Sequence, residues 1–243
     1  MPNLDDIIWA AITFWNITII PGAWSYNQAY LSIVGNDRFL EKLRYHPQEL
    51  NVNDVRNIFV EFLNKWGCRL RNYDNVTATN LKNHILDVHP ELLPIQNYSI
   101  LDFDLDIPEN RERAEHIFNS FWFYGSPIAK NFGPTATSKV LHIINPDLFI
   151  MWDEAIRLHY WIQDNEIIDS GRAYIFYLIE TKKIAARLVE ECRERFNTTD
   201  PASLFSEKLN IKPPHSLVKF IDEFNWLAYK RRLIKPPDWV CPF

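Results

Sequence analysis

Apolar residues recur at helical spacing along most of this chain, and proline residues separate one apolar run from the next. Val55, Ile58, Phe59 and Phe62, for example, would share one helix face, whereas sustained alternation of apolar and polar residues is nearly absent. Only 6 Gly occur among 243 residues, so the turns that join paired strands are scarce. The pattern predicts a mostly α fold, with helices near residues 4–18, 25–34, 36–45, 52–65, 78–88, 109–123, 134–144, 154–163, 172–196 and 215–234 and a strand or acidic loop at 101–106.

Composition excludes several kinds of site. Cys68, Cys192 and Cys241 are too few and too widely spaced for a disulfide framework, a four-cysteine metal site or an iron–sulfur cluster. The aspartates of residues 102–106 lack the glycine and the terminal glutamate of a calcium loop. The chain has no P-loop, dinucleotide fingerprint, HExxH pair or GxSxG motif. We therefore expect no metal and no cofactor.

The N-terminal residues predict a cytoplasmic protein. The first six residues lack the basic start of a signal peptide. The apolar stretch of residues 7–20 is too short, and too often interrupted by polar residues, to span a bilayer. We expect neither export nor a membrane partner.

The charge balance argues against general affinity for nucleic acid. The formal net charge is −5 and the isoelectric point is about 5.8, whereas nucleic-acid-binding proteins normally carry a basic surplus. Lysine and arginine nevertheless cluster at residues 65–71 and 230–235, which is enough to form a basic face on an acidic protein. Each cluster taken alone is equally typical of a solvated helix end.

Residues 131–153 combine a glycine turn, a short helix and an aspartate. Gly133 can take a positive φ, and Pro134 suits the first position of a helix that Pro146 must end. The N–H groups at such a helix start can bind a phosphate, and the carboxylate of Asp153 beyond the next loop could serve the attached sugar. Alone, Asp153 reads most simply as the N-cap of the following helix, and Lys139 as a surface lysine.

A second face of this helix carries polar residues. Thr135, Lys139 and His142 lie at i, i+4 and i+7, so they share one side of the helix. Thr135 would sit beside the exposed N–H groups of the first turn.

This segment resembles the hairpin of the helix-hairpin-helix superfamily of DNA glycosylases. That hairpin carries a glycine-x-glycine turn, an apolar helix and then an aromatic residue, a proline and the catalytic aspartate. The adenine-glycosylase type aligns without a gap. Asn131 and Gly133 fall at the two glycines, Phe149 at the aromatic position and Asp153 at the catalytic aspartate. The match covers about a tenth of the chain, and the remainder agrees only in its helical character.

Three departures shape what the resemblance implies. Asn131 replaces a glycine, Ile150 replaces the usual proline, and Trp152 places a large ring beside the aspartate. Where bifunctional members carry the Schiff-base lysine, this chain has Pro134 or Thr135, so the resemblance implies a monofunctional enzyme. Lys139 lies one helical turn later and remains a candidate for a displaced lyase lysine.

The resemblance implies a DNA glycosylase that flips a modified or damaged base out of double-stranded DNA and hydrolyses its N-glycosidic bond. Asp153 would stabilise the positive charge that develops at C1′. Some prokaryotic glycosylases excise modified bases from phage DNA in antiviral defence, as well as acting in DNA repair. The implied DNA-binding residues are Lys130, Asn131, Gly133 and Thr135, and the implied aromatic base pocket consists of Trp152, Trp24 and Tyr26.

The resemblance further implies two helical lobes with a DNA cleft between them. Residues 30–152 would form the lobe that carries the hairpin, and residues 1–29 with 153–243 would form the second lobe of a monomer. Two alternatives stay open. One is a non-catalytic nucleic-acid-binding module that uses the basic residues 230–235, and the other is an all-α protein interaction domain, which the acidic isoelectric point favours.

Overall fold

The computed structural model describes residues 1–15, 23–68, 70, 75–121, 132–160 and 171–232. In these ranges the chain forms helices and contains no strand, which confirms the mostly α fold. The α-helices are α1 (Leu4–Trp15), α2 (Ala23–Val34), α3 (Asp37–Tyr45), α4 (Val52–Asp54), α5 (Glu61–Lys65), α6 (Asn75–Leu92), α7 (Pro108–Phe121), α8 (Pro134–Ile144), α9 (Glu154–Tyr160), α10 (Gly171–Phe196), α11 (Pro201–Lys208) and α12 (Leu217–Asn225). Short 3₁₀ or π-helical turns are η1 (Pro47–Glu49), η2 (Val55–Val60), η3 (Leu93–Ile95) and η4 (Trp226–Lys230).

Most helices lie where the apolar spacing predicts them. The bounds of α8 match the expected range 134–144, because Pro134 opens the helix and Asn145 and Pro146 end it. The short helix α11, which Asp200 caps through its side chain, was not expected. Residues 101–106 form turns, so of the two alternatives for this segment the loop is correct and the strand is not.

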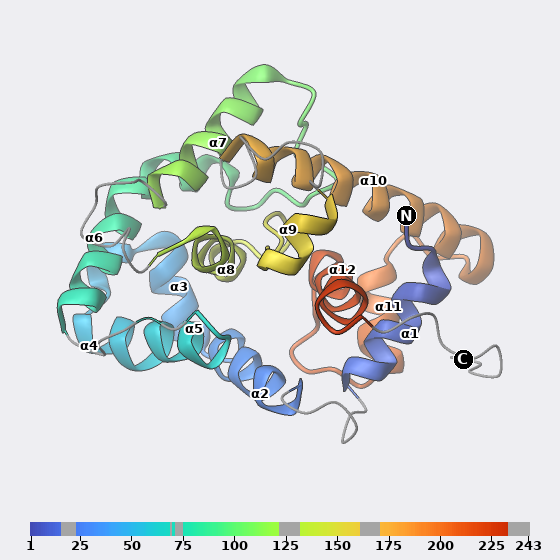
Figure 1. Cartoon of the computed structure of the whole chain (residues 1–243), viewed down its shortest axis with the longest axis horizontal. Coiled ribbons are helices and arrows are strands. Elements are labelled where there is room, and N and C mark those ends of the chain that lie inside the picture. Colours follow the sequence, from blue (N-terminus) through green and yellow to red (C-terminus); the bar gives the residue numbers. More distant parts are fainter. Residues whose placement is uncertain (16–22, 69, 71–74, 122–131, 161–170, 233–243) are drawn as a thin grey trace.

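Helix α8 lies in the middle of the molecule (Figure 1). It contacts α3, α5 and α7, and every residue from Ala136 to Ile144 is buried. The polar face expected from Thr135, Lys139 and His142 is therefore not a solvent-exposed face. The His142 ring bonds Tyr30 and the carbonyl of Phe149, and burial lowers the pKa of His142 to about 3, so the imidazole is neutral.

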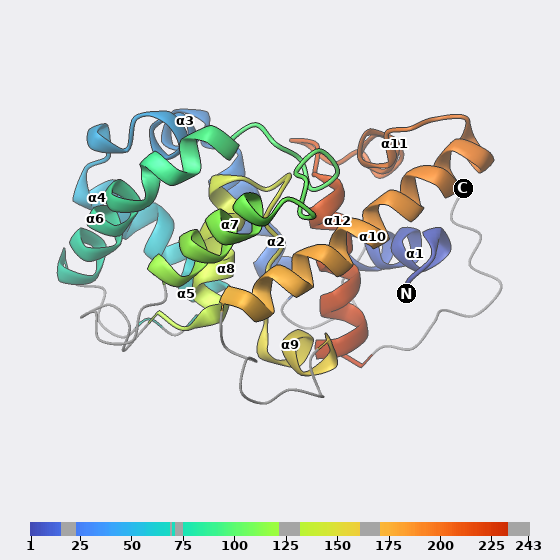
Figure 2. The ribbon, with the colours of Figure 1, turned by 90° about the horizontal axis from the view of Figure 1, so that it is seen from above.

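The other helices gather around α8 and around α12 (Figures 1 and 2). Helices α3 to α6 gather on one side, whereas α1 and α11 lie on the other, next to α12. The long helix α10 contacts both α7 and α12, and so joins the two sides. Because α7 and α10 pack closely together, the division into lobes at residues 30 and 153 stays a prediction.

The hairpin itself also stays a prediction, because the loop between α7 and α8 falls in residues 122–131, outside the described ranges. Among the helices that are described, none combines the length and the apolar character needed to cross a membrane.

Candidate functional site

Gly133 precedes α8 in an extended conformation. Its φ is −77° and its ψ is 179°, so the expected positive φ is wrong. The Gly133 carbonyl accepts a hydrogen bond from the N–H of Thr137 at 3.1 Å, which places Gly133 at the N-cap of α8. Pro134 follows at the first helical position, where its fixed φ suits the helix and its missing N–H costs nothing.

Thr135 and Ser138 join the start of α8 to the loop that carries Asp153. The Thr135 hydroxyl donates to the carbonyl of Trp152 at 3.2 Å and accepts from Nη1 of Arg157 at 3.3 Å. The N–H of Trp152 donates to Oγ of Ser138 at 2.8 Å. These bonds hold the backbone at Trp152, and hence the position of Asp153, against the first turn of α8.

Asp153 opens α9, as expected, but its side chain does not cap that helix. Its carbonyl accepts the first helical bond, from the N–H of Arg157 at 2.9 Å. Oδ1 of Asp153 accepts from Nζ of Lys139 at 3.2 Å, and Oδ2 accepts from Nζ of Lys230. In the described part of the chain no backbone N–H of α9 donates to this carboxylate. Lysine side chains from α8 and η4, rather than the helix, hold the carboxylate.

Lys139 is buried in spite of its charge, with only 3% of its surface exposed. Besides Asp153, its Nζ bonds the carbonyl of Trp66 at 2.6 Å. Burial by itself lowers the pKa of Lys139, but the adjacent Asp153 carboxylate outweighs it and the pKa rises. Lys139 is therefore protonated at neutral pH.

Asp153 is held in its ionised form. It is 8% exposed, and burial alone would raise its pKa. The positive charges and hydrogen bonds of Lys139 and Lys230 outweigh burial and lower the pKa of Asp153 below its ordinary value of 3.8. The result is a nearly buried carboxylate that keeps its negative charge at neutral pH.

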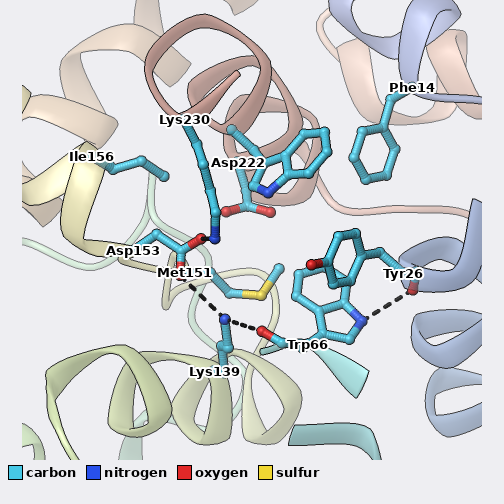
Figure 3. A pocket seen from close by; sticks show the side chains of 10 residues that line it. Phe14, Tyr26, Trp66, Lys139, Met151, Asp153, Ile156, Asp222 and Lys230 are labelled. Carbon is cyan, nitrogen blue, oxygen red and sulfur yellow. Dashed lines mark hydrogen bonds and ion pairs between the residues drawn. The ribbon is translucent and has the colours of Figure 1, made fainter. Parts of the chain in front are cut away.

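This carboxylate faces a pocket with aromatic and apolar walls (Figure 3). The empty volume is about 390 Å³, part of it open solvent, but only about 20 Å³ of it can hold the centre of a water-sized sphere. That is room for about one or two water molecules, so a larger ligand must displace a side chain. The lining residues are Phe14, Tyr26, Trp66, Lys139, Met151, Asp153, Ile156, Asp222, Trp226 and Lys230.

The structure brings together only part of the expected site. Tyr26 lines the pocket beside Asp153 and Lys139, as expected. Trp152 does not line it. The Trp152 ring is fully buried, stacks on Tyr177 of α10 at 5.8 Å and has Phe118 of α7 at its edge. An apolar ring held between two helices belongs to the core, so the expectation for Trp152 is wrong.

Other expected site residues lie elsewhere. Lys130, Asn131 and the side chain of Trp24 are outside the described residues. Gly133 and Thr135 are partly exposed at the start of α8, where Arg157 adds a positive charge. Sequence reasoning did not single out Arg157.

Seven lining residues were missed as site residues. Three are apolar, namely Phe14, Met151 and Ile156, and the other four are Trp66, Asp222, Trp226 and Lys230. These four lie far from Asp153 in sequence, on α12, on η4 and at the end of α5. Lys230 was expected on a basic surface, but its Nζ turns inward to Asp153. The sequence did contain a signal for Asp222. Residues 217–221 are apolar except for Lys219, and the charged residues Asp222 and Glu223 follow them directly.

A second ionic cluster lies on α12, and one of its members, Asp222, lines the same pocket. Nζ of Lys219, which is fully buried, lies 3.3 Å from Oδ2 of Asp222 and 3.2 Å from Oε1 of Glu223. Phe14, Tyr30 and Trp66 surround this ammonium group, with ring centroids 4.8 to 5.2 Å away. We call Asp153, Lys139 and Lys230 the pocket cluster, and Lys219, Asp222 and Glu223 the α12 cluster.

Neither cluster resembles a metal site. Among the described residues, no three histidine, cysteine, aspartate or glutamate side chains gather in a way that could hold a metal ion. In comparisons with known proteins, no family model, no curated protein and no solved structure matched this chain.

Proposed function

We propose that this chain is a DNA glycosylase that hydrolyses the N-glycosidic bond of a flipped-out modified or damaged base, with Asp153 as the catalytic carboxylate. The observation that carries the proposal is the Asp153 side chain. It is ionised, it faces an aromatic-walled pocket, and the helix it opens does not use it as a cap. The register that aligns Asp153 with the catalytic aspartate of the helix-hairpin-helix glycosylases supports the same role.

The chemistry needs a fixed negative charge beside the sugar. As the bond from C1′ to the base breaks, positive charge develops on the sugar, and a carboxylate in a site of low dielectric stabilises it and orients the attacking water. The hydrogen bond from Lys139 fixes the position of the Asp153 carboxylate before the substrate arrives. No side-chain reorganisation around Oδ1 is then needed during the reaction.

Lys230 must move when the substrate binds. With both lysines in place the pocket cluster carries one net positive charge, which opposes a developing cation. Lys139 is buried, whereas the Lys230 side chain is 39% exposed, so Lys230 is the partner that can swing out. Its departure makes room in the pocket and leaves Oδ2 of Asp153 facing the sugar. The displaced ammonium group can then pair with a DNA phosphate.

The aromatic walls suit an extruded base. Flipping a nucleotide costs a few kcal/mol, and stacking on an aromatic ring returns roughly 1–3 kcal/mol per base. Tyr26, Trp66 and Trp226 are the lining rings that we assign to this role. Gly133 and Thr135 at the start of α8 would contact the phosphate backbone together with Arg157 of α9, which bonds Thr135. Arg157 would supply local positive charge on an acidic chain.

The protonation state of Lys139 supports a monofunctional reaction. A lyase lysine attacks C1′ as a neutral amine, whereas Asp153 raises the pKa of Lys139 and keeps it charged. Borohydride should therefore trap no covalent complex between the wild-type protein and DNA. A trapped complex that disappears in Lys139→Ala would show that the enzyme is a lyase instead.

The test is release of free bases, detected by mass spectrometry. Wild-type protein is incubated with alkylated, deaminated and oxidised DNA and with DNA from phages that carry modified bases. We expect one or more free bases from the wild type, and about 1,000-fold slower release from Asp153→Asn. Glu154→Gln, which changes the exposed neighbouring carboxylate, is the matched control and should retain activity.

Three outcomes would overturn the proposal. The first is full activity in Asp153→Asn. The second is salt-sensitive DNA binding by the wild type without release of any base, which would favour a nucleic-acid-binding module. The third is absence of DNA binding at low salt, which would favour a protein interaction domain.

A further inference from the structure

Asp222 places a second carboxyl group in the pocket of Asp153. It lies on α12, about 70 residues after Asp153 in the chain, and lines the same pocket. Figure 3 shows the Asp222 carboxyl group pointing into the pocket next to the end of Lys230. Two carboxyl groups that come from different elements and line one pocket are the kind of arrangement that hydrolysis of a glycosidic bond uses.

The α12 cluster leaves Asp222 poorly neutralised. Lys219 is shared between Asp222 and Glu223. Glu223 has a further donor, because Nε1 of Trp15 bonds its carboxylate at 3.1 Å. The only hydrogen bond described for the Asp222 side chain is the one from Lys219, at 3.3 Å.

The balance of these interactions favours the protonated form of Asp222. Burial raises its pKa to about 6, although Lys219 acts in the opposite direction. The negative charges of Asp153 and Glu223 add to the increase. Asp153, by contrast, has its pKa lowered, so one pocket holds one carboxylate and one carboxyl group that retains its proton in mildly acidic solution.

Charged and titratable groups face this part of the molecule from several elements. On α12 itself they are Lys219 and Glu223, and the loop before α9 contributes Asp153. The neighbouring elements contribute Lys139 from α8, Lys230 from η4, Tyr30 from α2, and Tyr174 and Tyr177 from α10. The pKa values of the three tyrosines are raised by burial, so these residues stay neutral.

This inference rests on the proposed function. We propose that Asp222 is the general acid of the reaction and donates its proton to the departing base from the α12 side of the pocket. The bond between C1′ and the base nitrogen breaks, and its electron pair goes to the base, which takes up the proton of Asp222. A water molecule then adds its oxygen to C1′ and loses a proton, which returns to Asp222 through solvent. The products are the neutral base and a sugar hydroxyl.

The test compares rates of base release across pH for the wild type, Asp222→Asn and Glu223→Gln. The substrate is a duplex that carries a neutral base released by the wild type. Glu223 is the matched control, because it is buried on the same helix and contacts the same lysine but does not line the pocket. General acid catalysis contributes about 100-fold to 10,000-fold, so Asp222→Asn should lower kcat by at least about 100-fold.

The pH profile separates catalysis from structural support. In the wild type, kcat/KM should fall as pH rises above about 6, because the free enzyme loses the proton of Asp222. Glu223→Gln should keep this decline even if it lowers the amount of folded protein, whereas Asp222→Asn should lack it. The wild-type profile can be measured even if Asp222→Asn fails to fold.

Three results would overturn the role of Asp222 while leaving the proposed function intact. The first is a wild-type rate that does not decline above about pH 6, and the second is an unchanged rate in Asp222→Asn. The third is a wild type that releases only bases that already carry a positive charge, such as N7-methylguanine, because these bases leave without taking up a proton. Failure of the wild type to release any base would instead count against the proposed function.

Discussion

The pocket cluster and the α12 cluster contain the same two kinds of charged group in opposite proportions. Two lysines, Lys139 and Lys230, bind the single carboxylate of Asp153, whereas Lys219 alone serves Asp222 and Glu223. The pKa of Asp153 is accordingly lowered, and that of Asp222 is raised to about 6. The number of cations for each carboxylate, and not burial alone, therefore decides which carboxyl group keeps its proton.

The clusters also differ in accessibility. Lys219 and Glu223 are fully buried, so nothing from solvent can replace either partner. The pocket cluster has one partner, Lys230, whose side chain is 39% exposed. We therefore expect substitutions of Lys219 and Glu223 to change mainly stability, and substitutions of Lys230 to change mainly ligand binding.

The largest expected effect on stability comes from Lys219→Met. This variant leaves Asp222 and Glu223 buried without their cation, and breaking a buried ion pair costs about 3–5 kcal/mol. Urea denaturation at pH 7 measures the loss of unfolding free energy. Lys183→Met, which breaks an exposed pair with Glu180, is the control and should cost less than about 1 kcal/mol.

The second effect is a dependence of stability on pH that Asp222 contributes. Because the pKa of Asp222 in the folded protein, about 6, lies above its ordinary value of 3.8, its contribution is complete below pH 3.8 and is lost as pH rises through about 6. A difference of about two pH units corresponds to roughly 3 kcal/mol.

Urea denaturation of the wild type and Asp222→Asn between pH 4 and pH 7 measures this contribution. The difference in unfolding free energy, wild type minus variant, should fall as pH rises. A difference that stays constant would show that Asp222 titrates at its ordinary pKa.

A smaller effect is expected from Lys139→Met. The variant removes the buried partner of Asp153 and the donor to the Trp66 carbonyl, and an unsatisfied buried acceptor costs about 1–3 kcal/mol. The pKa of Asp153 should rise, because Lys139 is one of the two cations that lower it. Asp153 contributes to stability only in its ionised form. That contribution is then lost at a higher pH during acidification, so the midpoint of acid unfolding, followed by circular dichroism, should move to higher pH. An unchanged midpoint would mean that Lys139 does not hold Asp153 ionised.

The smallest effect on stability is expected from Lys230→Met. Because this side chain is partly exposed, the pair with Asp153 should contribute less than about 1 kcal/mol. DNA binding should weaken, and its dependence on salt concentration should decrease, if the displaced lysine pairs with a phosphate. A loss of stability as large as that of Lys139→Met would contradict a movable Lys230.

The sequence predicts one wall of the pocket much better than the other. Pro134, Pro146 and an apolar stripe mark α8, so the helix and the aspartate that follows it could be placed in advance. The side chains of Trp152 and Asp153 point in different directions, however, and sequence spacing does not show which one faces the core. Trp152 is consequently buried against α10 rather than in the pocket.

The other wall depends on contacts that local patterns do not encode. The pair of Lys230 and Asp153 joins residues 77 positions apart. A lysine near the end of a helix is usually solvated, so nothing in residues 226–232 distinguishes an inward-facing Lys230 from a surface residue. Asp222 was detectable only as a charge beside an apolar helical sequence, a feature that equally fits a structural ion pair.

The role of Asp153 is tested most directly by single-turnover release of the identified base by wild-type protein, Asp153→Asn and Lys139→Met/Asp153→Asn. The double variant leaves no buried lysine without a partner, so it separates loss of chemistry from loss of fold. We predict that both variants bind DNA and release the base about 1,000-fold more slowly than the wild type, the loss expected when a preorganised electrostatic group is removed. Release at the wild-type rate by either folded variant would contradict this prediction.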